Sequence, residues 1–197
     1  MSAPIGSPEN QTSAIKGLHF VGQTNAIKSM AANAQRFRDM VSALPADTQL
    51  LIERPPAAAD WISMEHRLNL HNAAVKVCFA GDTLRFFEVG KLTAKHTTRL
   101  AYRAFIKFMS PEQVAKRAST LWQMITRNNG VLNYAEPSSK TIELSYVGLF
   151  LTNEAYWQFV RGNLTYFMEC TGVKNTSVTL ISGGRTEPHA TFRLTWT

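Results

Sequence analysis

The chain has 197 residues, is 45% hydrophobic and 18% charged, and carries a formal net charge of +7. This composition is typical of a globular protein with its own hydrophobic core and excludes an intrinsically disordered chain. No apolar run reaches the length of a transmembrane segment, and the polar first residues do not form a secretory signal, so we expect a cytoplasmic protein.

The first half of the chain is predicted to be helical. Residues 1–14 have no apolar period and predict a flexible tail, after which residues 15–197 are expected to form a single domain. Residues 15–21 form a short apolar run that predicts either a strand or the lead-in to a helix. Apolar residues then recur at steps of three and four over residues 27–44, which predicts a helix that ends at Pro45.

Another helix is predicted to begin with either Asp60 or Ser63 as its N-cap and to run to about Phe79. A long basic helix is predicted to follow over residues 83–108. Its cations are four residues apart and form one ridge, made of Lys91, Lys95, Arg99, Arg103 and Lys107. Residues 91–127 hold eight basic residues and one acidic residue, so they carry the whole net charge. The ridge predicts either a binding surface for an acidic partner protein or an ordinary solvated helix face. The chain has no recognised DNA-binding motif, which argues against nucleic acid as a partner.

The last third of the chain has the clearest pattern. Ser110 is a natural N-cap, Pro111 suits the first helical position and Gln113 completes a capping box, which together predict a helix. A further helix is expected between Asn153 and Gly172. Alternating apolar residues predict two hairpins around it, with strands at residues 131–135, 141–147, 177–181 and 190–196.

These elements predict an α+β fold. Helices dominate residues 15–127, and residues 128–197 have the order β-β-α-β-β. We therefore expect N-terminal helices packed on a C-terminal antiparallel sheet, because this arrangement buries the apolar faces of both.

Several short segments of the chain resemble those of a known family. They are FEVGK at 87–91, SPEQ at 110–113, NNG at 128–130, TGVKN at 171–175 and FRLTW at 192–196. The chain resembles an uncharacterised family of similar length in myxobacteria and related deltaproteobacteria. That family is distantly similar to the superfamily of haem-nitric-oxide-binding proteins, vinyl-reductase-like sensors and TRAPP transport subunits. The resemblance implies a sensory or scaffold protein, often a dimer, and not an enzyme.

The same resemblance bears on cofactors. Haem-binding members of the superfamily use a proximal histidine and a Tyr-x-Ser-x-Arg clamp for the haem propionates. The nearest segment here, residues 144–148, lacks the Ser and the Arg, so we predict no cofactor and expect haem to be disfavoured. A metal site is not expected either, because His66 and His71 are five residues apart rather than four.

The aromatic helical positions have two interpretations. They predict either the lining of an apolar ligand pocket with a few polar groups, or a plain packed core. The pocket candidates are Tyr102, Phe105, Trp122, Tyr156, Phe159, Arg161 and Phe167. No set of residues predicts a catalytic group: carboxylates are sparse, and Cys170 lies in an apolar helical pattern.

The sequence therefore supports two functional hypotheses. The first is a non-enzymatic cytosolic sensory or signalling module that binds a small apolar ligand or a partner protein. The second is a homodimeric adaptor or scaffold that binds an acidic partner through the basic helix at residues 91–107.

Overall fold

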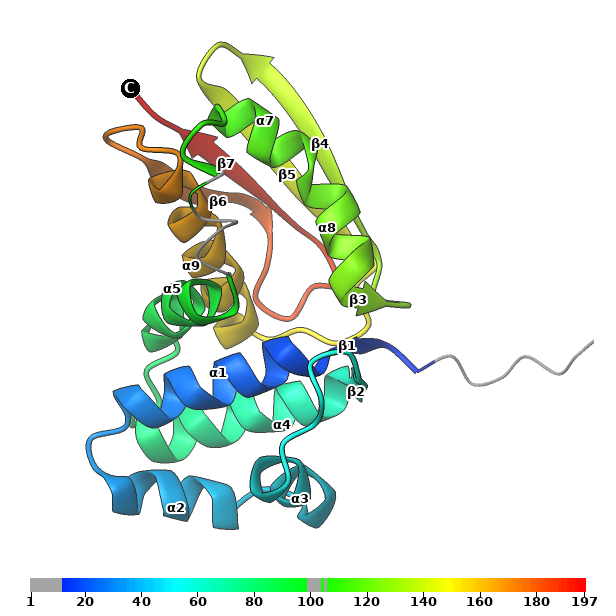
Figure 1. Ribbon diagram of the computed structural model, residues 1–197, viewed down its shortest axis with the longest axis vertical. Helices are drawn as coiled ribbons and strands as arrows, with labels where there is room; N and C mark the ends of the chain where they lie inside the picture. Colours follow the sequence, from blue (N-terminus) through cyan, green and yellow to red (C-terminus); the bar gives the residue numbers. More distant parts are fainter. Residues whose placement is uncertain (1–11, 99–103, 105) are drawn as a thin grey trace, which may run out of the picture.

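The structure, a computed structural model, describes residues 12–98, 104 and 106–197 (Figure 1). The four-stranded sheet and the helices that cover it lie in the upper part of the view, and the N-terminal helices lie in the lower part. The first half of the chain forms β1 (Ala14–Lys16), α1 (Gly17–Met30), α2 (Ala34–Ser42), α3 (Ala46–Glu53), β2 (Trp61–Ser63), α4 (Met64–Ala73), a π-helical turn η1 (Ala74–Cys78) and α5 (Arg85–Thr97).

The start of the domain differs from the prediction. The predicted tail at residues 1–14 is too long, because Ser13 and Ala14 are buried and Ala14 begins β1. The Ser13 hydroxyl donates a hydrogen bond to Asn129 Oδ1 at 3.0 Å, which ties this strand to the middle of the chain. β1 lies in a small antiparallel sheet of order β2-β1-β3, where β3 is Thr126–Arg127. The apolar run at 15–21 is thus both a strand and a helix start.

The two long helices predicted from periodicity are each interrupted. The helix over 27–44 divides into α1 and α2, because Asn33 has an extended backbone and its side chain caps α2 by accepting a hydrogen bond from the Arg36 N–H. The basic helix over 83–108 is also wrong, since α5 ends at Thr97 and Thr98 is extended (ψ 112°). Residues 91–107 are therefore not one helix, and Lys107 lies in a turn.

The C-terminal third has the predicted order of elements, although the helix predicted after Ser110 is divided in two at Arg117. It forms α7 (Pro111–Lys116), α8 (Ala118–Ile125), β4 (Val131–Ser138), β5 (Thr141–Val147), α9 (Glu154–Cys170), β6 (Ser177–Gly183) and β7 (Ala190–Thr195). The sheet order is β4-β5-β7-β6 and every pair is antiparallel. The capping box predicted at Ser110 and Gln113 is present. The α+β class and the β-β-α-β-β order are confirmed.

One face of this sheet is buried by helices. Ile142, Leu144 and Tyr146 of β5 alternate with exposed or half-exposed residues, and Phe192 and Leu194 of β7 are buried beside them. The helices α7 and α8 lie against β4 and β5, while α9 lies toward β6 (Figure 1). α9 in turn packs on α5, which joins the sheet region to the N-terminal helices.

Two glycines allow the close crossing of α5 and α9. A Cβ atom on Gly90 would collide with the carbonyl oxygen of Phe159, and one on Gly162 would collide with the carbonyl oxygen of Phe87. These contacts are with backbone atoms, which cannot move aside as a flexible side chain can. The two glycines therefore fix α9, and Phe159 with it, at a short distance from α5.

Candidate functional site: an apolar cavity between the helices and the sheet

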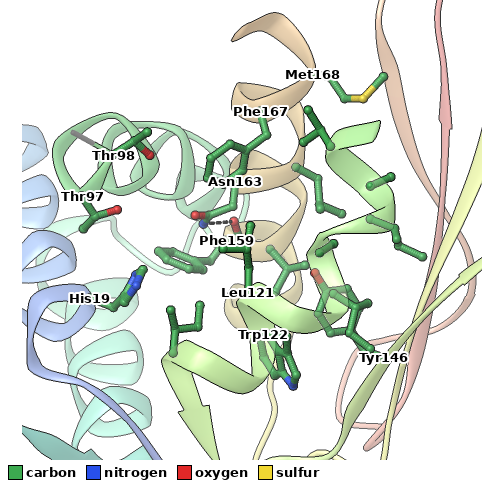
Figure 2. A pocket seen from close by; sticks show the side chains of 18 of the residues that line it. His19, Thr97, Thr98, Leu121, Trp122, Tyr146, Phe159, Asn163, Phe167 and Met168 are labelled. Atoms are coloured by element: carbon green, nitrogen blue, oxygen red, sulfur yellow. Dashed lines mark hydrogen bonds between the residues drawn. The ribbon is translucent and has the colours of Figure 1, made fainter. Parts of the chain in front are cut away.

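A cavity of about 470 Å³ lies where the N-terminal helices meet the sheet region. Figure 2 shows His19 and Thr97 on one side of it and Trp122 and Tyr146 on the other. Its size is within the range of small-molecule and cofactor sites, about 300–1,000 Å³. The lining residues come from β1, α1, α4 and α5 (Ile15, His19, Arg67, Thr97), from α7 and α8 (Pro111, Val114, Ala115, Ala118, Leu121, Trp122, Ile125), from the sheet (Leu132, Leu144, Tyr146, Leu194) and from α9 (Tyr156, Phe159, Val160, Asn163, Leu164, Phe167, Met168), with Thr98 beside α5.

The wall formed by α7 and α8 is apolar. Ala118, Leu121, Trp122 and Ile125 recur at steps of three and four, which places them on one face of α8. Trp122 is held in place from two sides: its Nε1 donates a hydrogen bond to the Asn129 carbonyl oxygen at 3.3 Å, and its ring meets that of Tyr146 edge to face at 5.2 Å. This wall thus presents a fixed hydrocarbon surface to the cavity.

The opposite wall carries a histidine. His19 lies in the first turn of α1, Ile15 lies in β1, and both side chains line the cavity. Burial, and to a smaller extent the charge of Arg67, lowers the pKa of His19 from 6.5 to about 4. The imidazole is therefore neutral at physiological pH. Its ring nitrogens make no hydrogen bond to any residue that the structure describes.

The same wall carries a buried cation. Arg67 on α4 is only 3% exposed and lines the cavity. Its Nε donates a hydrogen bond to Gln23 Oε1 at 3.2 Å, and its guanidinium carbon lies 4.6 Å from the ring centre of Phe159 and 5.0 Å from that of Tyr156. Gln23 also hydrogen-bonds His71, whose pKa burial lowers. None of the ion pairs among the described residues includes Arg67.

Two tyrosines add buried hydroxyls to the cavity. Burial raises the pKa of Tyr146 and of Tyr156 above the ordinary value, so both are neutral hydroxyls. The Tyr156 hydroxyl lies near Arg67 and Asn129, which oppose that rise, yet it makes no hydrogen bond of normal geometry with a described residue. The cavity is thus mostly hydrocarbon. Its polar groups are the imidazole of His19, the guanidinium of Arg67, the two tyrosine hydroxyls, and the side chains of Thr97, Thr98 and Asn163.

The seven predicted pocket residues have different locations. Trp122, Tyr156, Phe159 and Phe167 line the cavity. Arg161 does not; its guanidinium lies over the ring of Phe87, 4.8 Å from the ring centre. Tyr102 and Phe105 lie outside the described residues.

The sequence reasoning missed His19 and Arg67. A signal for Arg67 existed: Arg67, Leu70, His71 and Ala74 follow a spacing of three and four, and all four are buried. An arginine and a histidine on the apolar stripe of a helix are unusual core residues and point to a polar site inside the protein.

The predicted basic ridge is not a continuous surface. Lys91 forms an ion pair with Glu169 of α9, with 2.8 Å between Nζ and Oε1, so its charge is matched within the chain. Lys95 and Lys107 are exposed. Arg99 and Arg103 lie outside the described residues, and binding of an acidic partner by this segment stays a prediction.

The residues that the structure describes contain neither a metal-binding cluster nor a membrane-spanning helix. No three His, Cys, Asp or Glu side chains converge as a metal cluster would. No helix in the described ranges is long and apolar enough to cross a membrane.

The fold is similar to that of H-NOX domains. An Fe(II) unliganded H-NOX protein from K. algicida has a TM-score of 0.67 at 7% identity, with 93% of this chain and 97% of that chain covered. An oxygen-binding H-NOX domain related to soluble guanylate cyclases has a TM-score of 0.63 at 12% identity, covering 93% and 95%. A structure from work on heme distortion in the H-NOX family has a TM-score of 0.62 at 12% identity, again covering 93% and 95%. At such identities the likeness shows the fold alone.

Sequence comparison adds nothing to this likeness: no protein-family model matches the chain, and no curated protein matches it. The haem-nitric-oxide-binding part of the predicted resemblance agrees with the fold. The myxobacterial and deltaproteobacterial family stays a prediction.

The likeness corrects the prediction that the chain has no cofactor and that haem is disfavoured. The similar structures are described by their heme, their iron and their oxygen complex, which points to haem. The prediction was wrong because it depended on five residues of one strand. A cavity is built by contacts between segments far apart in the sequence, and no single segment reveals it.

The cavity residues fit a haem, but not through the expected motif. Helices α7 and α8 contain no histidine, and the Tyr-x-Ser-x-Arg pattern read from Tyr146 meets Gly148 and Phe150 instead of Ser and Arg. His19 is the one histidine that lines the cavity among the described residues. A neutral imidazole is a haem iron ligand, so His19 is the residue that would hold the iron.

Proposed function

We propose that this chain is a sensory domain that binds one haem in its cavity, and that His19 is the residue that would hold the iron. The observation that carries the proposal is the neutral imidazole of His19, which lines an apolar cavity and has no hydrogen-bond partner among the described residues. A bound haem iron supplies a coordination position at which a diatomic gas binds.

The other cavity residues have simpler roles in this proposal. The apolar wall of α8 and the ring of Phe159 would contact the two faces of a flat, mostly hydrocarbon group and exclude water from it. The low pKa of His19 keeps its lone pair available for the metal at neutral pH, because no proton competes for it.

The proposal is for a sensor rather than an enzyme. The charged side chains that line the cavity include no carboxylate, so a pair of groups for acid–base catalysis is not present in the described part of the site. A cytoplasmic location and a homodimeric state remain part of this proposal as expectations from the sequence. The adaptor hypothesis receives no support from Lys91, whose partner is Glu169.

A haem titration tests the proposal. The purified chain is mixed with ferric haem, and the absorbance of the Soret band is followed to saturation. We expect one haem per chain, and a weaker affinity in His19→Ala by at least about a hundredfold, since residues that only support a metal ligand already contribute 10–100-fold. His96→Ala, an exposed position near the end of α5, is the matched control and should bind as the unchanged chain does.

Added imidazole separates ligation from folding. In His19→Gly, free imidazole should enter the cavity and restore the spectrum of the unchanged chain. An unchanged chain that binds no haem, or a His19→Ala variant with an unaltered spectrum and affinity, would rule the proposal out.

A further inference from the structure

Arg67 is a buried cation that has no counter-charge among the residues that the structure describes. It is 3% exposed, and no carboxylate among the described residues forms an ion pair with it. An arginine keeps its proton even when burial lowers its pKa, as it does here. A charge of this kind is expensive to bury unless it is paired. Its position on the cavity surface therefore requires an explanation that the packing of the core does not give.

The protein holds the guanidinium in a fixed orientation. Gln23, itself fully buried, accepts the hydrogen bond from Nε, and the rings of Tyr156 and Phe159 lie against the guanidinium. Apart from the interaction of Arg67 with the Tyr156 hydroxyl, no hydrogen bond joins its two terminal amino groups to a described residue. The Tyr156 hydroxyl, buried beside Arg67, also lacks a well-formed hydrogen bond there. Preorganised donors of this kind are typical of a site that receives an anion.

We infer that Arg67 recognises a carboxylate, and that the ligand class of the cavity is an acid with an apolar body. This inference and the proposed function concern the same cavity. The inference rests on the proposed function in one respect: both require that a ligand occupies the cavity. The carboxylate accepts hydrogen bonds from the terminal amino groups of Arg67, with Tyr156 as a further donor. The apolar body lies against Leu121, Trp122 and Phe167.

The chemistry of the site favours a carboxylate over a phosphate. The cavity lining offers one guanidinium and otherwise mostly hydrocarbon, whereas a phosphate dianion needs several donors to replace its hydration. The planar fork of Arg67 matches the two oxygens of a carboxylate. Two sources share this chemistry: a carboxylate side chain of a porphyrin and the head group of a fatty acid.

The test compares each acid with its ester. The probes are metal-free protoporphyrin IX with its dimethyl ester, and oleate with methyl oleate, and binding is measured by quenching of tryptophan fluorescence. Removing the iron makes the porphyrin test independent of His19. The variants are Arg67→Met, Arg67→Lys and, as an exposed control, Arg85→Met. Near-UV circular dichroism checks that each variant is folded.

We expect the unchanged chain to prefer an acid over its ester by roughly ten- to a hundredfold, the effect of a charge-assisted hydrogen bond. Arg67→Met should remove this preference, Arg67→Lys should keep part of it, and Arg85→Met should not alter it. Equal binding of acid and ester by the unchanged chain, binding of neither probe pair, or a preference that survives in Arg67→Met would overturn the inference.

The two probe pairs also separate this inference from the proposed function. A preference seen with both pairs, or with the porphyrin pair alone, supports the carboxylate site and leaves haem as the ligand. A preference seen with the oleate pair alone supports the carboxylate site and counts against haem. A loss of haem in His19→Ala with no acid preference in the unchanged chain would support the haem site and overturn the role of Arg67.

Discussion

The two walls of the cavity differ in chemistry. The wall from α1 and α4 brings His19 and Arg67, an imidazole that is neutral at physiological pH and a cation. The wall from α7 and α8 is hydrocarbon apart from the indole of Trp122, whose N–H is already bonded to Asn129. A ligand that fits both walls has a polar or metal-bearing side and an apolar side.

This difference assigns separate roles to the two halves of the chain. The C-terminal sheet with its helices forms a rigid apolar container, because its inward residues alternate regularly along the strands. The imidazole and the cation come from α1 and α4, outside the β-β-α-β-β order, whereas the hydroxyls of Tyr146 and Tyr156 lie within it. Because the apolar lining and the His19 and Arg67 side chains lie in different segments, their residues can be substituted independently. The same fold can therefore hold ligands of different chemistry.

The largest effect is expected where α9 crosses α5. Gly162→Ala places a Cβ against the Phe87 carbonyl oxygen, so the two helices must separate and Phe159 must leave the cavity wall. We expect the free energy of unfolding to fall by about 2 kcal/mol despite the better helix propensity of alanine. Chemical denaturation measures this, with Thr165→Ala on the same helix as the control. A variant as stable as the unchanged chain would show that the crossing is loose.

The next effect belongs to the polar wall and depends on pH. The pKa of His19 is about 4 in the folded chain and 6.5 when exposed, so the unfolded chain takes up its proton first as the pH falls. Stability is therefore lost between pH 6.5 and pH 4, on the order of 1 kcal/mol for this partly buried group. His19→Leu should reduce the slope of stability against pH over this range. His71, also with a lowered pKa, keeps the slope from vanishing; identical slopes would contradict the account of His19.

A substitution in the apolar wall should increase the stability of the protein and decrease its affinity for haem. Ala118→Leu fills part of the cavity with hydrocarbon, which should stabilise the free protein by about 1 kcal/mol through burial of methylene groups. The same change should weaken haem binding by about tenfold, because the ligand loses that space. Thermal unfolding and a haem titration test the two effects, and Thr120→Leu, exposed on the same helix, is the control. Haem binding that is unaffected would place the ligand elsewhere.

The smallest effect is expected outside both walls. Lys91 and Glu169 form an ion pair whose side chains are 27% and 46% exposed, so Lys91→Gln should change the free energy of unfolding by less than about 1 kcal/mol and leave haem binding unchanged. Denaturation at low and high salt measures this. A large loss of haem affinity would mean that the ridge, and not the cavity, carries the function.

The sequence predicted the C-terminal half well and the N-terminal half only in part. Strict alternation at Ile142, Leu144 and Tyr146 and the capping box at Ser110 are local signals, and both were confirmed. The strands β1, β2 and β3 have only two or three residues, too few for a period to be visible. The extended residue Thr98 ends α5 without a glycine or proline nearby, so that helix end had no signal.

The site was less predictable than the fold. Aromatic stripes correctly predicted that Trp122, Tyr156 and Phe159 line the cavity. A stripe of this kind does not distinguish a cavity from a packed core, because both bury the same face of a helix. Arg67 and His19 were not predicted because a search for apolar periodicity does not select polar residues. A buried polar residue is nevertheless a stronger sign of a functional site than a buried apolar one.

Native mass spectrometry of the full chain, expressed with a supply of haem precursor and purified without chelator, tests the central claim most directly. The account predicts an added mass of one haem per chain, which His19→Ala loses and His96→Ala keeps. A chain that carries no haem under these conditions, or one that keeps its haem in His19→Ala, would contradict it.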